Sequence, residues 1–125
     1  MNTPANLKYT KSDEWFDPAS GAAGITDFAQ NQLSDIVFVE ILVDAGEEVT
    51  VGKAIASVES VKASAEIYSP VAGKVSGVNK GLADKPETLN SDPFGEGWMI
   101  KVEGASADGL MDSAAYEADC AGRAH

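Results

Sequence analysis

The chain has 125 residues, 44% of them hydrophobic, which is enough to bury one core, so a single domain spanning residues 1–125 is predicted. Twenty acidic and nine basic residues give a net charge of −11, which disfavours nucleic acid and anionic membranes as partners. There is no membrane-length apolar run and no signal-peptide pattern at the start, so a soluble monomer is expected. Cys120 is the single cysteine and only His125 could join it at a metal, so neither a disulfide nor a metal site is expected.

The first predicted helix follows Thr26, which can act as an N-cap for residues 28–33. Residues 36–43 come next and are rich in β-branched and aromatic side chains, and Asp44–Gly46 closes the run with turn residues. A short run of this composition predicts a largely buried strand.

Turn residues then recur at short intervals, which is typical of short antiparallel strands and not of a βαβ sheet. The fold class expected is therefore mainly β, a sandwich or flattened barrel of two sheets. The strands are predicted at residues 48–51, 54–59, 63–68, 73–78 and 98–102.

Two further helical segments are predicted towards the end of the chain. Pro86 can occupy the first position of a short turn that runs to Leu89. Ser113 can cap a C-terminal helix that begins at Ala114. The core is expected to span about residues 7–118, and residues 119–125 are expected to form a frayed tail.

Lys62 is the most informative residue. It lies between two β-rich runs without a Gly-rich loop, so it is predicted to stand exposed at a tight hairpin turn. Gly46 and Gly73 bracket it at points where positive φ or close backbone approach is expected. A rigidly presented lysine suits a modifying enzyme, because a flexible loop would lose entropy on binding. The alternative is an ordinary solvated surface lysine.

This arrangement resembles the lipoyl and biotinyl carrier domains, which are flattened barrels with the modified lysine at a hairpin tip. Val61 and Ala63 stand where biotinyl domains usually carry methionine, so lipoylation is favoured. Six ordered blocks then resemble the glycine cleavage H-protein family over residues 7 to about 118. These blocks are residues 8–15, 24–30, 35–40, 59–63, 68–73 and 92–100. Asp13 departs from the family, which more often has histidine there.

The resemblance implies a barrel-sandwich hybrid and a carrier, not an enzyme, and the chain contains no catalytic triad, phosphate loop or metal cluster. Lipoate on Lys62 would shuttle the aminomethyl group of glycine. The implied partners are glycine decarboxylase (P-protein), aminomethyltransferase (T-protein), dihydrolipoamide dehydrogenase (L-protein) and a lipoate ligase or lipoyl/octanoyl transferase. The compartment would be cytoplasmic in a bacterium and the mitochondrial matrix in a eukaryote. The alternatives are a lipoate-relay H-like protein or a biotinyl or lipoyl domain of another acyl-transfer complex.

Several residues besides Lys62 are assigned roles. Glu59, with Val61 and Ala63 beside the lysine, is a candidate for recognition by the lipoylating enzyme, and an ordinary solvated charge is the equal alternative. The resemblance also implies a cleft that shelters the loaded arm, and its candidate residues are Ser12, Glu14, Gln32 and Glu66. The alternative for both cleft glutamates is an ordinary surface charge. The aromatic residues Trp15, Phe38 and Trp98 are assigned to core or sheet-face packing.

Overall fold

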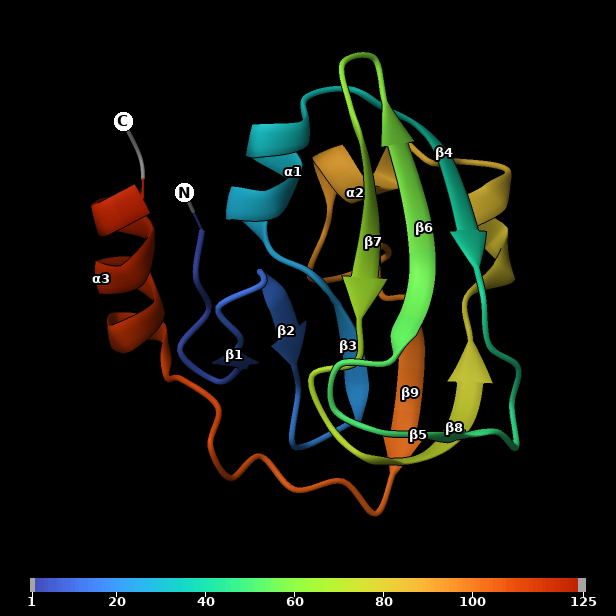
Figure 1. Ribbon diagram of the computed structural model, residues 1–125, viewed down its shortest axis with the longest axis vertical. Helices are drawn as coiled ribbons and strands as arrows, with labels where there is room; N and C mark the ends of the chain where they lie inside the picture. Colours follow the sequence, from blue (N-terminus) through green and yellow to red (C-terminus); the bar gives the residue numbers. More distant parts are fainter. Residues whose placement is uncertain (1, 124–125) are drawn as a thin grey trace.

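The structure is a computed structural model that describes residues 2–123, and its strands form two antiparallel sheets (Figure 1). The first sheet consists, in order across it, of β1 (Lys8–Tyr9), β2 (Glu14–Phe16), β3 (Ala22–Ile25), β9 (Ile100–Glu103), β8 (Gly73–Val78) and β5 (Glu48–Val49). The second sheet consists of β4 (Ile36–Ile41), β6 (Ala54–Ser60) and β7 (Ser64–Tyr68). The mainly β, two-sheet fold predicted from the sequence is confirmed.

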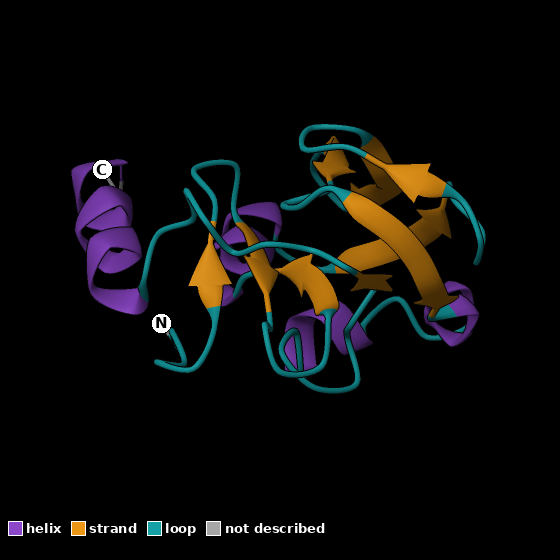
Figure 2. Cartoon of the chain, turned by 90° about the horizontal axis from the view of Figure 1, so that it is seen from below, coloured by secondary structure: helices purple, strands orange, loops and turns teal. Residues whose placement is uncertain are grey.

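The main core lies between the two sheets. Ile55 and Val58 on β6 belong to the same buried cluster as Ile25 on β3 and Ile100 on β9, and all four are fully buried. Side chains from strands of both sheets therefore share one core, as in the face-to-face packing of two sheets. The helices lie around the outside of the strands (Figure 2).

Strand β4 is less buried than its composition predicts. Ile36 and Val39 face the core, but 55% of Val37 and 46% of Phe38 is exposed. The pairing of β4 with β6 shifts register between Ile36 and Phe38, so two successive residues turn outward there. The prediction of a largely buried strand over residues 36–43 is therefore wrong for its outer face, and Phe38 lies on that face.

Helix α1 (Asp27–Leu33) follows the predicted cap. The hydroxyl of Thr26 accepts a hydrogen bond from the Ala29 N–H and also shares one with the hydroxyl of Tyr116. Phe28 enters a second buried cluster that contains Trp15, whose indole N–H donates to the carbonyl of Pro93 at 3.0 Å. Trp98 packs against this cluster and is half-buried, so both tryptophans pack as predicted.

The starts of the two later helices differ from the prediction. Helix α2 (Thr88–Ser91) begins two residues after Pro86, which lies in the preceding turn after the short 3₁₀ helix η1 (Lys80–Ala83). Helix α3 (Ser113–Arg123) is capped by Asp112, whose carboxylate accepts from the Ala115 N–H at 2.8 Å. Serine and aspartate are both good N-cap residues. The helix begins at Ser113, one residue earlier than predicted, so Asp112 and not Ser113 is its N-cap.

The predicted frayed tail is wrong over residues 119–123, which continue helix α3. Cys120 is buried in the second cluster, and Arg123 pairs with Asp13 at 2.6 Å, so contacts across the fold hold this end. The rest of the predicted tail, including His125, lies outside the described residues. No helix within residues 2–123 is long and apolar enough to cross a membrane.

Candidate functional site

Lys62 stands at the tip of the hairpin that joins β6 to β7, and this tip is the uppermost point of the molecule in Figure 1. The strands below it pair from Glu59 with Ser64 down to Ala54 with Tyr68. Lys62 is exposed, and its ammonium group makes no hydrogen bond or ion pair within residues 2–123. The sequence therefore folds into a rigid antiparallel stem that presents one unpaired amine.

Ser60, which the sequence interpretation missed, organises the turn around the lysine. Its hydroxyl oxygen accepts from the Lys62 N–H at 3.3 Å and the Ala63 N–H at 3.1 Å. Its own N–H donates to the carbonyl of Ala63 at 2.8 Å. A serine that bonds backbone two and three residues ahead is a known turn signal, so this role could have been found from the sequence.

The neighbours named for recognition by a modifying enzyme all face solvent. Val61 is 66% exposed, and Glu59 and Ala63 are also exposed. The N–H of Val61 donates to the carbonyl of Asp35 at 3.0 Å, which ties the tip to the loop before β4. The tip thus presents an apolar residue and a carboxylate within three positions of Lys62.

Glu14 is a buried carboxylate, with only 1% of its surface exposed. One carboxylate oxygen accepts from the hydroxyls of Ser12 at 2.5 Å and Thr10 at 2.7 Å, and the other accepts from the Tyr68 N–H at 3.3 Å. Burial raises the pKa of Glu14, and these hydrogen bonds oppose that rise only in part. Ser12 and Glu14 are therefore brought together beside the end of β7, and Thr10 is a partner that the sequence interpretation did not name.

The other two cleft candidates make no hydrogen bond or ion pair with Ser12 or Glu14 among residues 2–123. Glu66 is exposed on β7, two residues before Tyr68, and no contact joins it to Glu14 within residues 2–123. Gln32 is exposed on α1 and lines a groove that α3 completes with Glu117 and Ala121. The described contacts therefore assemble Ser12 with Glu14, while the assignments of Gln32 and Glu66 stay predictions.

Asp13 occupies the position where the family more often has histidine. It has φ of 72°, a conformation that residues other than glycine rarely adopt, and its carboxylate binds two nitrogens of Arg123 at 2.6 and 3.2 Å. The hydroxyl of Tyr116 also donates to it at 2.9 Å. Asp13 lies between Ser12 and Glu14, so these bonds tie that part of the chain to helix α3.

The two glycines that bracket Lys62 in sequence are needed for different reasons. Gly46 has φ of 96°, which favours glycine at that turn. At Gly73 a Cβ atom would lie 2.5 Å from the carbonyl oxygen of Glu103 on the neighbouring strand, so a side chain cannot fit there. Both positions satisfy the backbone requirement predicted from the sequence.

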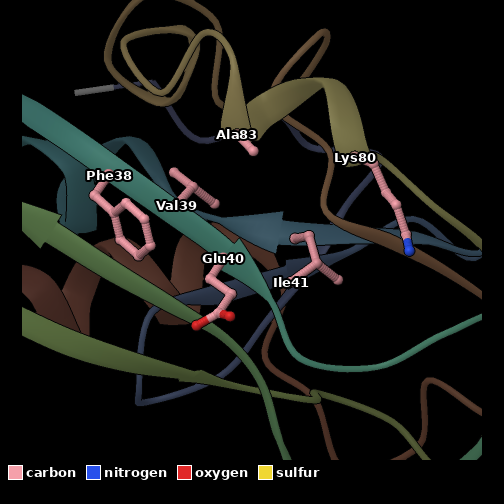
Figure 3. Close-up of a pocket in the computed structure, with 6 residues that line it drawn as sticks. All are labelled: Phe38, Val39, Glu40, Ile41, Lys80 and Ala83. Carbon is pink, nitrogen blue, oxygen red and sulfur yellow. The ribbon is translucent and has the colours of Figure 1, made fainter.

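A surface groove of about 310 Å³ lies between β4 and η1 (Figure 3). It is lined by Phe38, Val39, Glu40 and Ile41 of β4 and by Lys80 and Ala83 of η1. Phe38, which is 46% exposed, is part of this lining. It contains none of the residues predicted for the lysine hairpin or the sheltering cleft.

Comparison with known proteins decides the family. The sequence profile described as "Glycine cleavage H-protein" matches residues 7–122. The "Glycine cleavage system H protein" of Anaeromyxobacter sp. (strain K) is 48% identical over 123 residues, which covers 94% of this chain and 95% of that protein. The protein of the same name from Listeria monocytogenes serotype 4a is 49% identical over 94% of this chain and 97% of its own length. The chain belongs to the glycine cleavage H-protein family.

The fold agrees with this assignment. The crystal structure of a glycine cleavage system H protein from Mycobacterium marinum superposes with a TM-score of 0.83 at 32% identity, covering 92% of this chain and 96% of that one. The H-protein family supplies a non-catalytic lipoyl carrier to the glycine cleavage system, so the carrier function expected from the sequence is confirmed at the level of the family.

Proposed function

We propose that Lys62 is the residue of this H-protein family member that carries lipoate. The observation that supports this most directly is the placement of an unpaired amine at the tip of the β6–β7 hairpin, inside the segment that resembles the family's modification motif. Lys62 fits the group because amide formation at this exposed nitrogen breaks no contact within residues 2–123. The turn that Ser60 fixes presents it without an ordering cost.

Lys62 would hold the lipoyl group through an amide, and the group would supply a disulfide that could take up the aminomethyl unit at glycine decarboxylase with its own reduction. The dithiol left after release of that unit at the aminomethyltransferase would be the substrate that dihydrolipoamide dehydrogenase oxidises back to the disulfide. The chain contributes a rigid body and a long tether, which together give each partner enzyme a high local concentration of the same group. A lipoate ligase or lipoyl/octanoyl transferase would install it, with Glu59, Val61 and Ala63 as the surface read at the tip. The named relatives are bacterial, which favours the cytoplasmic alternative.

We further propose that the loaded arm would rest beside Ser12, which is exposed and donates a hydrogen bond to the buried carboxylate of Glu14. A buried carboxyl whose pKa is raised by burial gains most from a cation brought beside it, and the loaded arm ends in an amine. An ammonium beside Glu14 would keep its proton, and a protonated nitrogen cannot expel the thiolate. Glu66, exposed on β7, would meet the arm on its way to this pair, and Gln32 remains a further candidate.

The carrier function is tested by glycine carboxyl exchange. The lipoylated chain is mixed with glycine decarboxylase, glycine and labelled bicarbonate, and label entering the glycine carboxyl group is followed. We expect exchange with the wild-type chain and none with Lys62→Arg. A fully lipoylated chain that supports no exchange would contradict the carrier role and favour the lipoate-relay alternative.

A further inference from the structure

Residues 61–63 at the hairpin tip have a single hydrogen bond to the rest of the described chain outside the hairpin. It runs from the Val61 N–H to the carbonyl oxygen of Asp35, at 3.0 Å. This bond continues the pairing of β4 with β6, in which Ile36 lies opposite Ser60, so the loop of residues 34–35 directly borders the tip. Figure 1 shows this loop, between α1 and β4, passing over the top of the molecule beside the tip.

The loop is held in a strained conformation. Ser34 has φ of 66° and ψ of −150°, a region that is almost confined to glycine. Such a conformation persists only where the surroundings fix it. Some contact must therefore hold Ser34 in place for the Asp35 carbonyl to meet Val61.

Besides the Ser34 N–H, which donates to the carbonyl of Gln30 at 3.0 Å, Asn90 holds this loop from α2, far away in sequence. Its side-chain oxygen accepts from the Ile36 N–H at 2.9 Å, and its amide nitrogen donates to the carbonyl of Ser34 at 2.8 Å. The same nitrogen donates to the side-chain oxygen of Gln30 at 2.9 Å. Donor and acceptor thus clamp the loop on both sides of Asp35, and a flipped amide would set its N–H groups against the Ile36 N–H.

We propose that Asn90 is a positioning residue for the modification of Lys62. It acts through the Asp35 carbonyl, which fixes the hairpin tip in the orientation that the lipoylating enzyme reads. This inference rests on the proposed function of Lys62. Asn90 itself touches neither Lys62 nor any other residue of the turn among the described contacts, so its role is to present the lysine.

Loosening the loop should affect binding to the enzyme more than the chemistry of acylation. Loosening the loop does not change the chemical group that is acylated. A more mobile hairpin tip, however, loses more conformational entropy when the enzyme binds it. We expect Asn90→Ala to raise the KM for the apo-protein about tenfold and to leave kcat within about twofold.

The experiment compares Asn90→Ala with Asn79→Ala as a matched control. Asn79 is also an amide clamp, and it donates to the carbonyls of Glu96 at 2.9 Å and Trp98 at 2.8 Å, but it makes no contact with the hairpin. Two quantities are measured on apo-protein: the hydrogen-exchange rate of the Val61 amide by NMR, and the kinetics of lipoylation by a lipoate ligase with lipoate and ATP.

The proposal expects faster exchange at Val61 and a higher KM in Asn90→Ala, with wild-type values for both in Asn79→Ala. Unchanged Val61 exchange and an unchanged KM in Asn90→Ala would overturn it, and so would equal changes in both variants. If Asn90→Ala fails to fold, Asn90→Asp takes its place, because it keeps the acceptor for Ile36 and loses the donor to Ser34. A wild-type chain that gains no lipoyl group would overturn the proposed function of Lys62 instead. In that case the hydrogen-exchange rate of the Val61 amide would still test whether Asn90 holds the loop of residues 34–35.

Discussion

At the scale of single residues, Glu14 shows how strongly the fold changes the chemistry of one side chain. In the unfolded chain its carboxyl group titrates near its ordinary pKa of 4.5, and burial raises that pKa in the folded protein. Below pH 4.5 the group is protonated in both states and costs the fold nothing. Above pH 4.5 the carboxyl group ionises in the unfolded chain while it stays protonated in the folded protein. The free energy of unfolding therefore falls as the pH rises from 4.5 through the pKa of the folded protein.

Glu14→Gln should therefore gain stability relative to wild type as the pH rises. The free energy of unfolding should shift in favour of the variant by about 1.4 kcal/mol for each unit by which the folded pKa exceeds 4.5. Urea denaturation at about pH 4 and about pH 7 measures this. The control Glu66→Gln changes an exposed carboxylate and should alter stability by less than about 0.5 kcal/mol at either pH. A stability difference for Glu14→Gln that stays constant with pH would contradict the account.

The sequence interpretation named Lys62 as the attachment site and placed Ser12, Glu14, Gln32 and Glu66 in one cleft, because of the resemblance to the family. It could not show that the carboxylate of Glu14 is buried and bonded to the Tyr68 N–H, because these two residues are 54 positions apart in the sequence. Asn90 was missed for the same reason, since its contacts with Ser34 and Ile36 span more than fifty residues. Ser60 is local, and its turn signal was present in the sequence.

At the scale of elements, helix α3 is joined to the amino-terminal loop by a few specific contacts. Tyr116 stacks on Tyr9 with ring centroids 4.7 Å apart, and Arg123 pairs with Asp13 while its guanidinium lies 4.9 Å from the Phe28 ring centroid. These contacts fix the end of the helix and the loop that carries Ser12 and Glu14. They also explain why the chain remains helical as far as Arg123.

Arg123→Ala should lower the free energy of unfolding by about 1 kcal/mol, because it removes a two-nitrogen ion pair that is only partly screened by solvent. The matched control is Lys80→Ala. Its ion pair with Asp44 is longer, at 3.1 Å, and both side chains are about 70% exposed, so the loss should stay below about 0.5 kcal/mol. Urea denaturation measures both variants, and equal losses would show that the Asp13 pair does not anchor the helix.

Elements with strong local patterns were predictable, and elements made by distant pairing were not. The strands from β5 to β9 were located because turn residues bound them, whereas β1 and β2, at two and three residues, exist only through pairing with neighbours. The exposed face of β4 was missed because composition does not reveal the register shift near Phe38. The end of α3 was missed because its anchors lie at the other end of the chain.

At the scale of the whole molecule, two packed sheets form one body, and Lys62 projects from it at the tip of the β6–β7 hairpin. The net charge of −11 makes basic surfaces on partner enzymes the natural complement. Converting the Lys62 ammonium to an amide would change this charge to −12, since one positive charge is lost. The body should be unaffected, because the amine makes no contact within residues 2–123.

The most direct test of the account is the site of lipoylation by intact mass and peptide mapping. Apo-protein is incubated with lipoate, ATP and a lipoate ligase, and Lys53→Arg is the control because Lys53 is also exposed at a turn next to β6. The account predicts one lipoyl group on wild type and on Lys53→Arg, in both cases on the peptide that contains Lys62, and none on Lys62→Arg. A lipoyl mass on Lys62→Arg, or none on the wild-type chain, would contradict it.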